Sequence, residues 1–340
     1  MIFIFLALEM KIIIPVAGIG SKLRPHTHTQ PKALVPVAGK PILSHIVDYL
    51  IEGGYKDFIF IVGYLGDKIE EYVKSKYPHL KSSFVIQEPR EGTGQAVWMA
   101  KELVSDGDEL LIVLGDTIID YDLHSIVSSQ CSSLGIKKVD DPRQFGVAEI
   151  DNKGFITKLE EKPLIPKSNL ALVGIYYIKN GFLLMEALDH LIKNDIRYND
   201  EFNLTMGIQR MVQAGEQFST FQVGNWFDCG GKNNLLETNA TLLSYDKNIS
   251  NKKYNYSNTI IIHPVSIAPN CDISDSIIGP NVSIGDNTII RHSILSNSII
   301  GSYSQLESAI LHESVIGSDA YLKGLSQSLN IGDSTEIDFS

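Results

Sequence analysis

The sequence predicts an α/β fold, with a Rossmann-like and mostly parallel sheet that has helices on both faces, followed by a left-handed parallel β-helix. Two patterns predict it. Short apolar runs alternate with amphipathic segments in the first part of the chain. Aliphatic residues then recur near every sixth position towards the C-terminus. A charged, Asn-rich stretch separates the patterns, so we expect domains at 10–245 and 259–340 and a linker at 246–258.

Composition limits the classes of function. A chain of 340 residues predicts two domains, and the net charge of -11 argues against general nucleic-acid binding. The three cysteines are widely spaced and match no metal or redox pattern, which fits a reduced, cytoplasmic protein. Residues 1–9 are apolar but lack a basic start and are too short to span a membrane, so we expect no membrane partner. They are either a start-codon artefact or an additional edge strand.

The order of elements follows from the apolar pattern. Segments with apolar residues on one face predict helices at 41–55, 67–76 and 235–245, and one that opens at Glu201. Short apolar runs predict buried strands at 12–14, 58–62, 84–87, 110–116 and 172–177. Ligands of such sheets lie at the carboxyl ends of the strands. The loop after Ile14, Gln87 and Asp116 all fall at these ends.

The loop after the first strand has the character of a phosphate site. Gly18 and Gly20 let backbone N–H groups turn towards an anion. From Met10 to Val47 the chain has no Asp or Glu but five Lys or Arg. We therefore expect a local positive field for phosphate groups. The spacing fits neither a P-loop nor a dinucleotide fingerprint, because Leu23 replaces the third glycine of the latter.

A longer motif continues from this loop. It reads Gly-x-Gly-Ser-basic-Leu-x-Pro-x-Thr, then Pro-Lys, then Val-x-x-Lys-Pro-Ile at 37–42. The motif resembles the opening of the sugar-1-phosphate nucleotidylyltransferases, which include glucose-1-phosphate thymidylyl- and uridylyltransferases and mannose-1-phosphate guanylyltransferases. The resemblance implies that the loop holds the triphosphate and that Lys22 and Lys32 face its phosphates. The loop residues concerned are Ala17, Gly18, Gly20 and Ser21.

The same resemblance implies roles for later residues. Gln87 and Gly92 are expected at the nucleotide base, where a glutamine amide can donate and accept hydrogen bonds at once. Lys162 of the Glu-Lys-Pro motif is expected on the sugar phosphate. The sugar itself is expected to contact Gly146, Glu161, Gly174 and Glu201. The family often has Asp after Thr205, whereas this chain has Met206, which weakens the assignment of Glu201.

Two aspartates are the expected metal ligands. Asp116 ends a strongly apolar run, and Asp228 lies in Asn-Trp-Phe-Asp-Cys-Gly-Gly. Carboxylates are hard oxygen ligands that suit Mg²⁺, and the resemblance implies that this pair binds it. Only the fold could bring together two residues so far apart in sequence.

The reaction implied by the resemblance makes an NDP-sugar and pyrophosphate from an NTP and a sugar 1-phosphate. The sugar phosphate is already an anion, so in-line attack at the α-phosphorus needs no general base. We favour dTTP or UTP and a glucose-1-phosphate-like sugar, with mannose-1-phosphate guanylyl transfer as an alternative. The family usually has Arg where this chain has Lys22, so a non-catalytic paralogue that senses nucleotide sugars stays open.

The C-terminal repeat has near-identical copies. They are Asp-Ser-Ile-Ile-Gly at 275–279, Asn-Ser-Ile-Ile-Gly at 297–301 and Glu-Ser-Val-Ile-Gly at 313–317. Each aliphatic residue is expected to point into a narrow triangular core. We interpret the repeat as structural, stacking subunits of a homo-oligomer or docking on the catalytic domain. The alternative is a bifunctional enzyme whose β-helix transfers an acyl group with His292 or His312.

Overall fold

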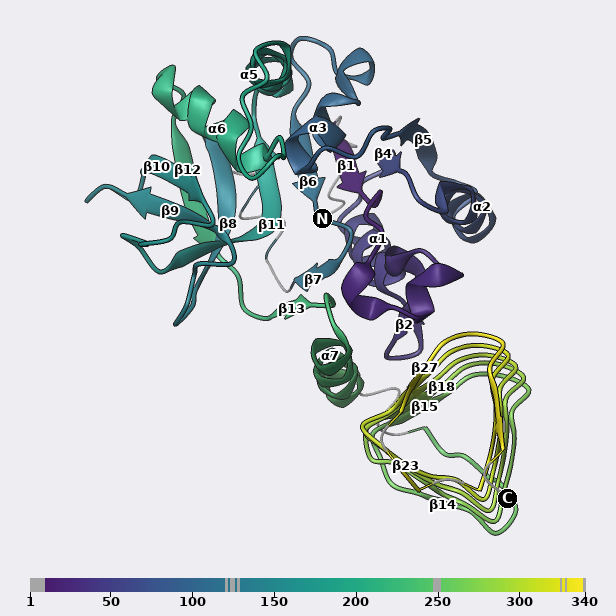
Figure 1. Cartoon of the computed structure of the whole chain (residues 1–340). Helices are drawn as coiled ribbons and strands as arrows, with labels where there is room; N and C mark the ends of the chain where they lie inside the picture. Colours follow the sequence, from purple (N-terminus) through teal and green to yellow (C-terminus); the bar gives the residue numbers. More distant parts are fainter. Residues whose placement is uncertain are drawn as a thin grey trace, which may run out of the picture. The chain divides into compact units, whose positions relative to one another are not determined.

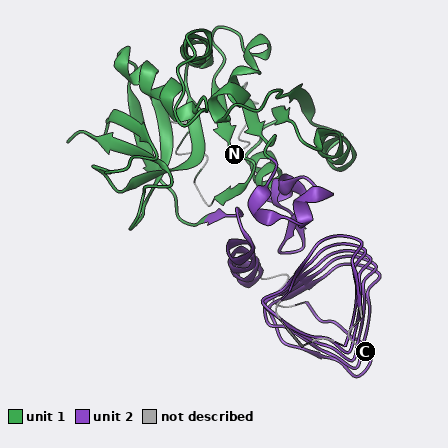
Figure 2. Ribbon diagram, in the orientation of Figure 1, with its two compact units in different colours: residues 1–18, 46–226 green, residues 19–45, 227–340 purple. Residues whose placement is uncertain are grey.

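The computed structural model describes residues 10–119, 122, 126, 129–246, 252–324, 326–327 and 329–338 (Figure 1). The chain divides into two compact units (Figure 2). Unit 1 comprises residues 1–18 and 46–226, and unit 2 comprises residues 19–45 and 227–340. The edge strand considered for residues 1–9 lies outside the described residues. The domain bounds expected from the sequence remain a prediction.

Unit 1 is built on a mixed sheet of nine strands, in the order β10-β9-β11-β6-β1-β4-β5 with β8 and β12 attached beside β11. Strands β6, β1, β4 and β5 run parallel, which is the Rossmann-like part, and β11 joins β6 antiparallel. The nine strands are β1 Lys11–Pro15, β4 Asp57–Val62, β5 Lys81–Ile86, β6 Leu110–Val113, β8 Ser132–Lys138, β9 Gly146–Ile150, β10 Ile156–Glu161, β11 Leu170–Ile178 and β12 Phe218–Gln222, and the short strand β7 Thr117–Ile119 lies outside this sheet. The predicted fold class is confirmed for this part of the chain.

Alternation along the strands places apolar residues on both faces of this sheet. Ile13 and Ile59 belong to the core beneath α3, α5 and α6, whereas Phe58 and Phe60 point to the opposite face, where Phe60 stacks on Phe84. The helices are α1 Ile42–Glu52, α2 Gly66–Lys76, α3 Thr93–Trp98, α5 Gly181–Lys193 and α6 Leu204–Gln213, with a short turn η4 at Lys101–Leu103.

Most element bounds differ from the expected ones by a few residues. α1 ends at Glu52, and β5 begins at Lys81. Similarly, α6 was expected to open at Glu201 and begins at Leu204. Tyr198 and Glu201 exchange backbone hydrogen bonds, with N to O distances of 2.9 and 3.2 Å. This bridge keeps Glu201 out of the helix.

Unit 2 contains the predicted left-handed parallel β-helix, made of three sheets of five parallel strands. The first is β14 Ile260–Ile261, β17 Ile277–Ile278, β20 Ile294–Ser296, β23 Ile310–His312 and β26 Ser326–Gln327. The second is β15 Val265–Ile267, β18 Val282–Ile284, β21 Ile299–Ile300, β24 Val315–Ile316 and β27 Asn330–Ile331. The third is β16 Asp272–Ser274, β19 Ile289–Arg291, β22 Gln305–Glu307, β25 Tyr321–Lys323 and β28 Glu336–Asp338.

The repeat explains this shape. The aliphatic side chains of the inner columns, such as Ile278, Leu295 and Leu311 of the first sheet, are buried in a common core. The corners contain residues with positive φ, such as Asn281 at 60° and Asn297 at 45°, a conformation that Asn adopts more easily than most residues. Short Asn, Asp and Ser side chains between the aliphatics therefore allow the chain to turn between the sheets.

The rest of unit 2 packs on the second sheet of the β-helix. The hairpin of β2 Pro36–Val37 and β3 Lys40–Pro41 and the helix α7 Lys232–Tyr245 meet at Asn239. The buried Asn239 amide accepts from Ala38 N at 2.9 Å and from Ser283 Oγ at 2.6 Å. The other elements are the turns η1 Ser21–Leu23, η2 His26–His28 and η3 Lys32–Leu34, and β13 Trp226–Asp228, which crosses the unit boundary.

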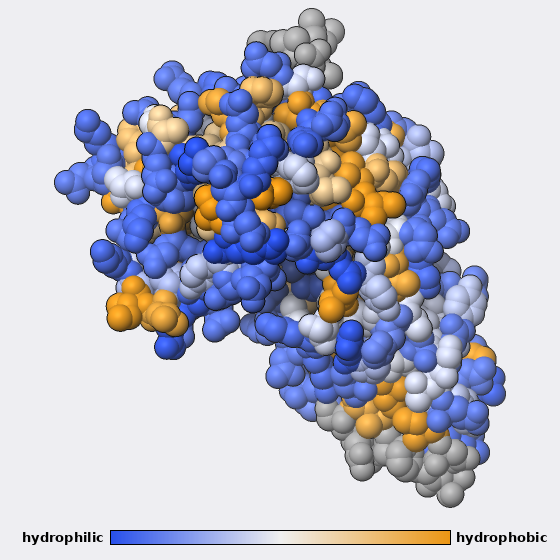
Figure 3. All heavy atoms as spheres, turned by 45° about the horizontal axis from the view of Figure 1, so that its top comes forward, coloured by the Kyte–Doolittle hydropathy of each residue, from blue (hydrophilic) through white to orange (hydrophobic). Residues whose placement is uncertain are grey.

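The molecular surface in Figure 3 is mostly hydrophilic, and apolar side chains gather there in small separate patches. Among the described residues, no helix combines the length and apolar character that crossing a membrane requires.

Candidate active site

The carboxyl ends of β1 and β6 lie beside Gly174, which is in the middle of β11. Backbone hydrogen bonds join the three segments: Gly115 N donates to Pro15 O at 3.2 Å, and Leu114 N donates to Gly174 O at 2.9 Å. Gly174 has φ +85°, which a side chain would strain, and a Cβ there would lie 3.0 Å from Leu114 Cδ1. The start of the glycine loop, Asp116 and the expected sugar-contacting Gly174 therefore lie in one row.

The glycine loop leaves this edge at Ala17 and Gly18. Ala17 is buried, and a Cβ on the neighbouring Gly63 would lie 2.9 Å from its carbonyl oxygen. Gly18 is exposed, and a Cβ added there would meet no atom within 4 Å. Space for a ligand is therefore present beside Gly18 and not beside Ala17.

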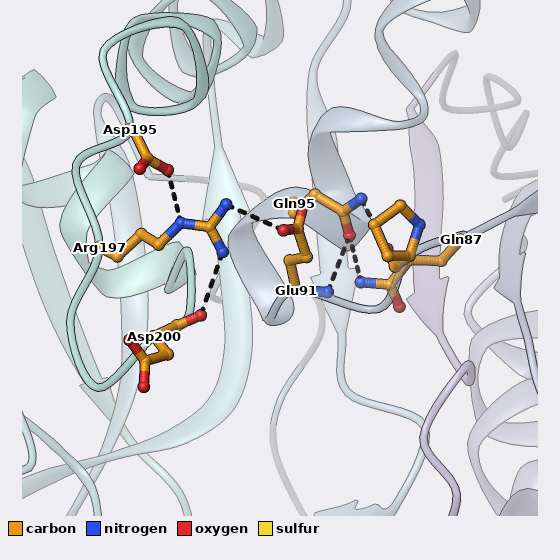
Figure 4. A network of polar contacts seen from close by, with 7 residues as sticks. Gln87, Glu91, Gln95, Asp195, Arg197 and Asp200 are labelled. Atoms are coloured by element: carbon orange, nitrogen blue, oxygen red, sulfur yellow. Dashed lines mark hydrogen bonds and ion pairs between the residues drawn. The ribbon is translucent and has the colours of Figure 1, made fainter.

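We call residues 87–95 the base loop. The Gln87 side chain is buried, and its Nε2 donates to Gly92 O at 2.9 Å and to Gln95 Oε1 at 2.6 Å (Figure 4). Gln95 Nε2 in turn donates to Pro89 O at 2.9 Å. The carbonyl of Gly92 accepts only, so it fixes which end of the Gln87 amide faces it.

This network changes the role expected of Gln87. Both hydrogens of its amide nitrogen are used inside the base loop, so Gln87 has only its oxygen to offer a ligand. The contact of Gln87 with the nucleotide base stays a prediction, and in this conformation the contact would use the amide oxygen. Gln87 lines a cleft of about 400 Å³ together with Gly63, Tyr64, Ile86, Glu88, Pro89 and Arg90.

Arg197 holds the base loop from outside. Its Nη2 donates to Glu91 Oε1 at 2.9 Å, and its Nε donates to Asp195 Oδ1 at 2.5 Å (Figure 4). The guanidinium also lies 4.2 Å from the centre of the Phe202 ring. Phe202 O accepts from Gly94 N at 2.7 Å, so residues 195–202 support the base loop by backbone and side-chain contacts.

The expected sugar side is organised around Glu161. Its Oε2 accepts from Thr205 Oγ1 at 2.7 Å, and a Cβ on Gly146 would lie 3.1 Å from the same oxygen. Gly146 therefore leaves room beside the carboxylate, and Thr205 orients it. Lys162 Nζ lies 3.9 Å from Glu161 Oε1 and is about half exposed. By contrast, the structure places Glu201 next to Gly92, where its Cβ would be 3.0 Å from a Cβ on that glycine.

Tyr176 is buried near both this carboxylate and Asp116. Burial raises the pKa of Tyr176 far above its usual value, and the negative charges of Glu161 and Asp116 raise it further. A neutral phenol ring therefore lies near both carboxylates at physiological pH. Within unit 1, the sugar-side Glu161 and the candidate metal ligand Asp116 belong to the same neighbourhood.

The two candidate metal ligands belong to different units. In unit 1, Asp116 Oδ1 accepts from Thr117 Oγ1 at 3.1 Å. In unit 2, Asp228 Oδ2 lies 3.5 Å from Asn234 Nδ2, and the absence of a side chain at Gly230 leaves the carboxylate uncrowded. Both supply the hard oxygens that Mg²⁺ prefers. The described residues contain no cluster of three or more His, Cys, Asp or Glu that could hold a metal by itself.

We call residues 19–30, in unit 2, the phosphate loop. Gly20 has φ +62°, and its carbonyl accepts from Thr27 Oγ1 at 2.9 Å. A Cβ on Gly20 would lie 2.8 Å from Thr27 Cγ2 and 3.0 Å from Lys32 Cβ. Ser21 and Lys22 are exposed, whereas Leu23 is buried and fixes the turn. The structure thus brings Lys32 to the same glycine that Lys22 follows.

Sequence reasoning missed the side chains that support these loops. Thr27 lies inside the quoted motif, in its Pro-x-Thr part, so its position was visible but its contact with Gly20 was not. Thr205 was noted only for its unusual neighbour Met206. Gln95 and Arg197 carried no signal, because their partners lie in other segments.

This fold and these loops define a nucleotide-binding enzyme of the α/β class. The family model described as nucleotidyl transferase matches residues 11–245, and the chain belongs to this family.

Relatives support the same assignment. The low-salt glycan biosynthesis nucleotidyltransferase Agl11 of Haloferax volcanii is 30% identical over 339 residues, covering 92% of this chain and 93% of that protein. A glucose-1-phosphate thymidylyltransferase of Streptomyces antibioticus is 31% identical, covering 86% and 87%. The bifunctional protein GlmU of Methanocaldococcus jannaschii is 38% identical over 235 residues, but this chain spans only 54% of that relative.

Solved structures resemble the fold. A putative glucose-1-phosphate thymidylyltransferase from Bacillus anthracis, in complex with sucrose, aligns with a TM-score of 0.58 at 28% identity, covering 68% of this chain and 94% of that one. A UDP-glucose pyrophosphorylase complexed with UDP-glucose aligns with a TM-score of 0.60, covering 69% and 98%, and at 21% identity it supports the fold alone.

Proposed function

We propose that this chain is a sugar-1-phosphate nucleotidylyltransferase, which makes an NDP-sugar and pyrophosphate from an NTP and a sugar 1-phosphate. One observation carries the proposal. The hydrogen bonds from Gly115 to Pro15 and from Leu114 to Gly174 join the nucleotide-side end of β1, the end of β6 and the sugar-side Gly174 of β11 in one row. Enzymes that join two phosphates need such a row, because most of their catalysis is alignment.

In the proposed reaction, each charged residue of the site contacts one of the reacting groups or the metal ion. An oxygen of the sugar phosphate attacks the α-phosphorus, and the bond from that phosphorus to the bridging oxygen breaks as pyrophosphate leaves. Lys162 holds the sugar phosphate, while Lys22 and Lys32 face the triphosphate and offset its repulsion. Asp116 and Asp228 are the ligands proposed for Mg²⁺, which when bound neutralises phosphate charge. Glu161 accepts from sugar hydroxyls and Thr205 keeps it in place.

The base is proposed from the fixed amide of Gln87. An acceptor at this position pairs with a ring N–H, which thymine, uracil and guanine have and adenine and cytosine lack at the equivalent edge. Because both amide hydrogens go to Gly92 and Gln95, the remaining oxygen fits thymine, uracil and guanine alike, and we propose dTTP or UTP with GTP as the rival. The sugar is proposed to be glucose-1-phosphate-like, the substrate class that names the Streptomyces antibioticus relative.

A pyrophosphate-release assay tests the function. The native chain is supplied with dTTP, UTP, GTP, CTP or ATP and with several sugar 1-phosphates in Mg²⁺. We expect turnover with at least one of the first three nucleotides, loss of turnover in Asp116→Asn, and near-native turnover in the control Asp106→Asn, which changes an exposed aspartate. A native chain that is silent on every pair yet binds an NDP-sugar tightly would support the sensor instead.

We also propose that the chain self-associates through its β-helix. Four isoleucines of the first sheet, Ile260, Ile277, Ile294 and Ile310, stack in register on its outer face. Ile260 is 60% and Ile310 49% exposed. The third sheet instead carries ion pairs on its outer face, such as Arg291 with Asp272 at 2.7 Å. A column of identical apolar side chains is self-complementary, so it suits a second copy of the chain.

Sedimentation velocity tests this contact. Ile294→Lys is expected to lower the mass of the assembly, whereas Gln305→Lys on the charged sheet leaves it unchanged. Equal masses for both variants and the native chain would contradict the proposal.

We propose a cytoplasmic location, which the three free cysteines support, since none of them forms a disulfide.

A further inference from the structure

The outer face of the second β-helix sheet is where other parts of unit 2 attach. Its outward column is Ser266, Ser283, Ile299, Val315 and Asn330, one residue for each rung. Ser283 holds Asn239 of α7, and Ile299 and Val315 are only 2% and 3% exposed. Other parts of unit 2 therefore contact several rungs of this column.

The last rung of this column contacts the phosphate loop. Asn330 Oδ1 lies 2.8 Å from His26 Nε2, and Asn330 Nδ2 donates to Arg24 O at 3.3 Å. Both partners belong to the segment between Lys22 and Thr27, although they lie about 300 positions earlier in the sequence, 304 for His26. One side chain of the β-helix therefore holds two consecutive turns of the phosphate loop.

Further contacts hold the last β-helix coil against the phosphate loop. Thr29 Oγ1 donates to the carboxylate of Asp333, and Gly332 lies against Pro25, where a Cβ would be 3.1 Å from Pro25 Cβ. The glycine allows the last coil to come close to the loop. The Asn330 amide, the Asp333 carboxylate and the backbone at Gly332, all from one coil, thus contact residues 24–29.

Within the phosphate loop, the position of His26 determines the position of Gly20 through Thr27. His26 is only 7% exposed, so its position is well defined. The next residue, Thr27, donates to Gly20 O and packs its methyl group against Gly20. A displacement of His26 therefore moves Thr27 and changes the turn whose N–H groups and Lys22 are assigned to the triphosphate.

We propose that Asn330 is a positioning residue for the nucleotide site, and that the last β-helix coil is part of that site's scaffold. This inference rests on the proposed function. Asn330 acts through His26 and the Arg24 carbonyl and touches no substrate. An asparagine suits the task because it accepts from the His26 ring and donates to a carbonyl at once. Burial lowers the pKa of His26, so the ring is neutral and its Nε2–H can donate to Asn330.

The test measures nucleotide binding and turnover separately, with the full chain. Isothermal titration gives Kd for dTTP, UTP and GTP without sugar 1-phosphate, and the pyrophosphate assay gives kcat and both KM values. Losing two neutral hydrogen bonds in Asn330→Ala is expected to raise Kd and KM for the nucleotide about 3- to 10-fold. Asn330→Asp keeps the acceptor and loses the donor, so its Kd and KM for the nucleotide are expected to lie between those of the native chain and of Asn330→Ala. KM for the sugar 1-phosphate is expected to stay within about twofold.

Gln305→Ala is the matched control, an exposed amide in a strand of the third sheet, and is expected to bind nucleotide as the native chain does. A merely structural role would lower the active fraction, and hence kcat, at unchanged KM values. A native chain that binds a triphosphate and an Asn330→Ala variant that binds it equally well would overturn the positioning role alone. A native chain that binds none of the three triphosphates would overturn the proposed function and this inference with it.

Discussion

The base loop and the phosphate loop both depend on a glycine with positive φ, but they are held in different ways. Gly92 in the base loop faces backbone: a Cβ there would lie 2.6 Å from Phe202 O. Gly20 in the phosphate loop faces the Thr27 methyl group and the Lys32 stem. The base loop is supported from within unit 1, whereas a β-helix coil supports the phosphate loop within unit 2. Backbone atoms cannot move aside for an added Cβ, whereas side chains can. A glycine-to-alanine substitution should therefore be more damaging in the base loop than in the phosphate loop.

Gly92→Ala should have the largest effect. The added methyl group meets the Phe202 carbonyl, and φ +109° is a conformation that side chains rarely adopt. Displacing the base loop is expected to lower kcat/KM for the nucleotide by about 100-fold, equivalent to about 3 kcal/mol. Gly107→Ala is the control, since that glycine also has positive φ but open space around it. Equal activity in both variants would show that the base loop is not rigid.

Gly20→Ala should be less damaging and partly reversible. Its closest obstacle is Thr27 Cγ2, which Thr27→Ser removes while keeping the hydroxyl that donates to Gly20 O. The single variant is expected to lose about 10-fold in kcat/KM, about 1.4 kcal/mol. The double variant is expected to recover part of this loss, leaving the strain of φ +62°. Kinetics of the four members of this mutant cycle measure the coupling, and a fully additive cycle would contradict it.

Gln95→Leu should weaken base selectivity more than overall activity. It removes one acceptor from Gln87 Nε2 and leaves the Pro89 carbonyl without its side-chain donor. The Gln87 amide could then rotate, so the preference for the best nucleotide over CTP is expected to fall about 5- to 10-fold. Ratios of kcat/KM for the two nucleotides check this. Gln213→Leu, which changes an exposed glutamine at the end of α6, should leave the ratio unchanged.

The smallest expected effect concerns pH and His26. Burial lowers its pKa in the folded chain, although Asn330 and Asp333 oppose the shift. The unfolded chain then binds the proton more readily, so the free energy of unfolding falls as pH drops below the ordinary value of 6.5. His26→Gln is expected to flatten this dependence between about pH 7 and 5. Urea unfolding of both forms across that range measures the slopes, and parallel slopes would refute the prediction.

The sequence by itself determined what depends on local pattern. Alternating apolar runs predicted the parallel strands, and the recurring aliphatics at 275–317 predicted the β-helix, because burial on one face imposes a period on the sequence. The fixed spacings from Gly18 to Ile42 identified the family that the comparisons then showed. The strand ends that carry Gly18, Gln87 and Asp116 were also predicted, since parallel strands present their carboxyl ends at one edge.

Only the tertiary structure decided which side chains support the loops. Thr205 and Glu161 are 44 positions apart, and Asn330 and His26 are 304 apart. Local periodicity in a sequence carries no information about which residues so far apart come into contact. Gln87 shows the same limit at short range, because its composition allows donation and acceptance and only the surrounding carbonyl and Gln95 leave it as an acceptor. Hydrogen-bonding capacity is a property of the residue, but the part of it left for a ligand is a property of the fold.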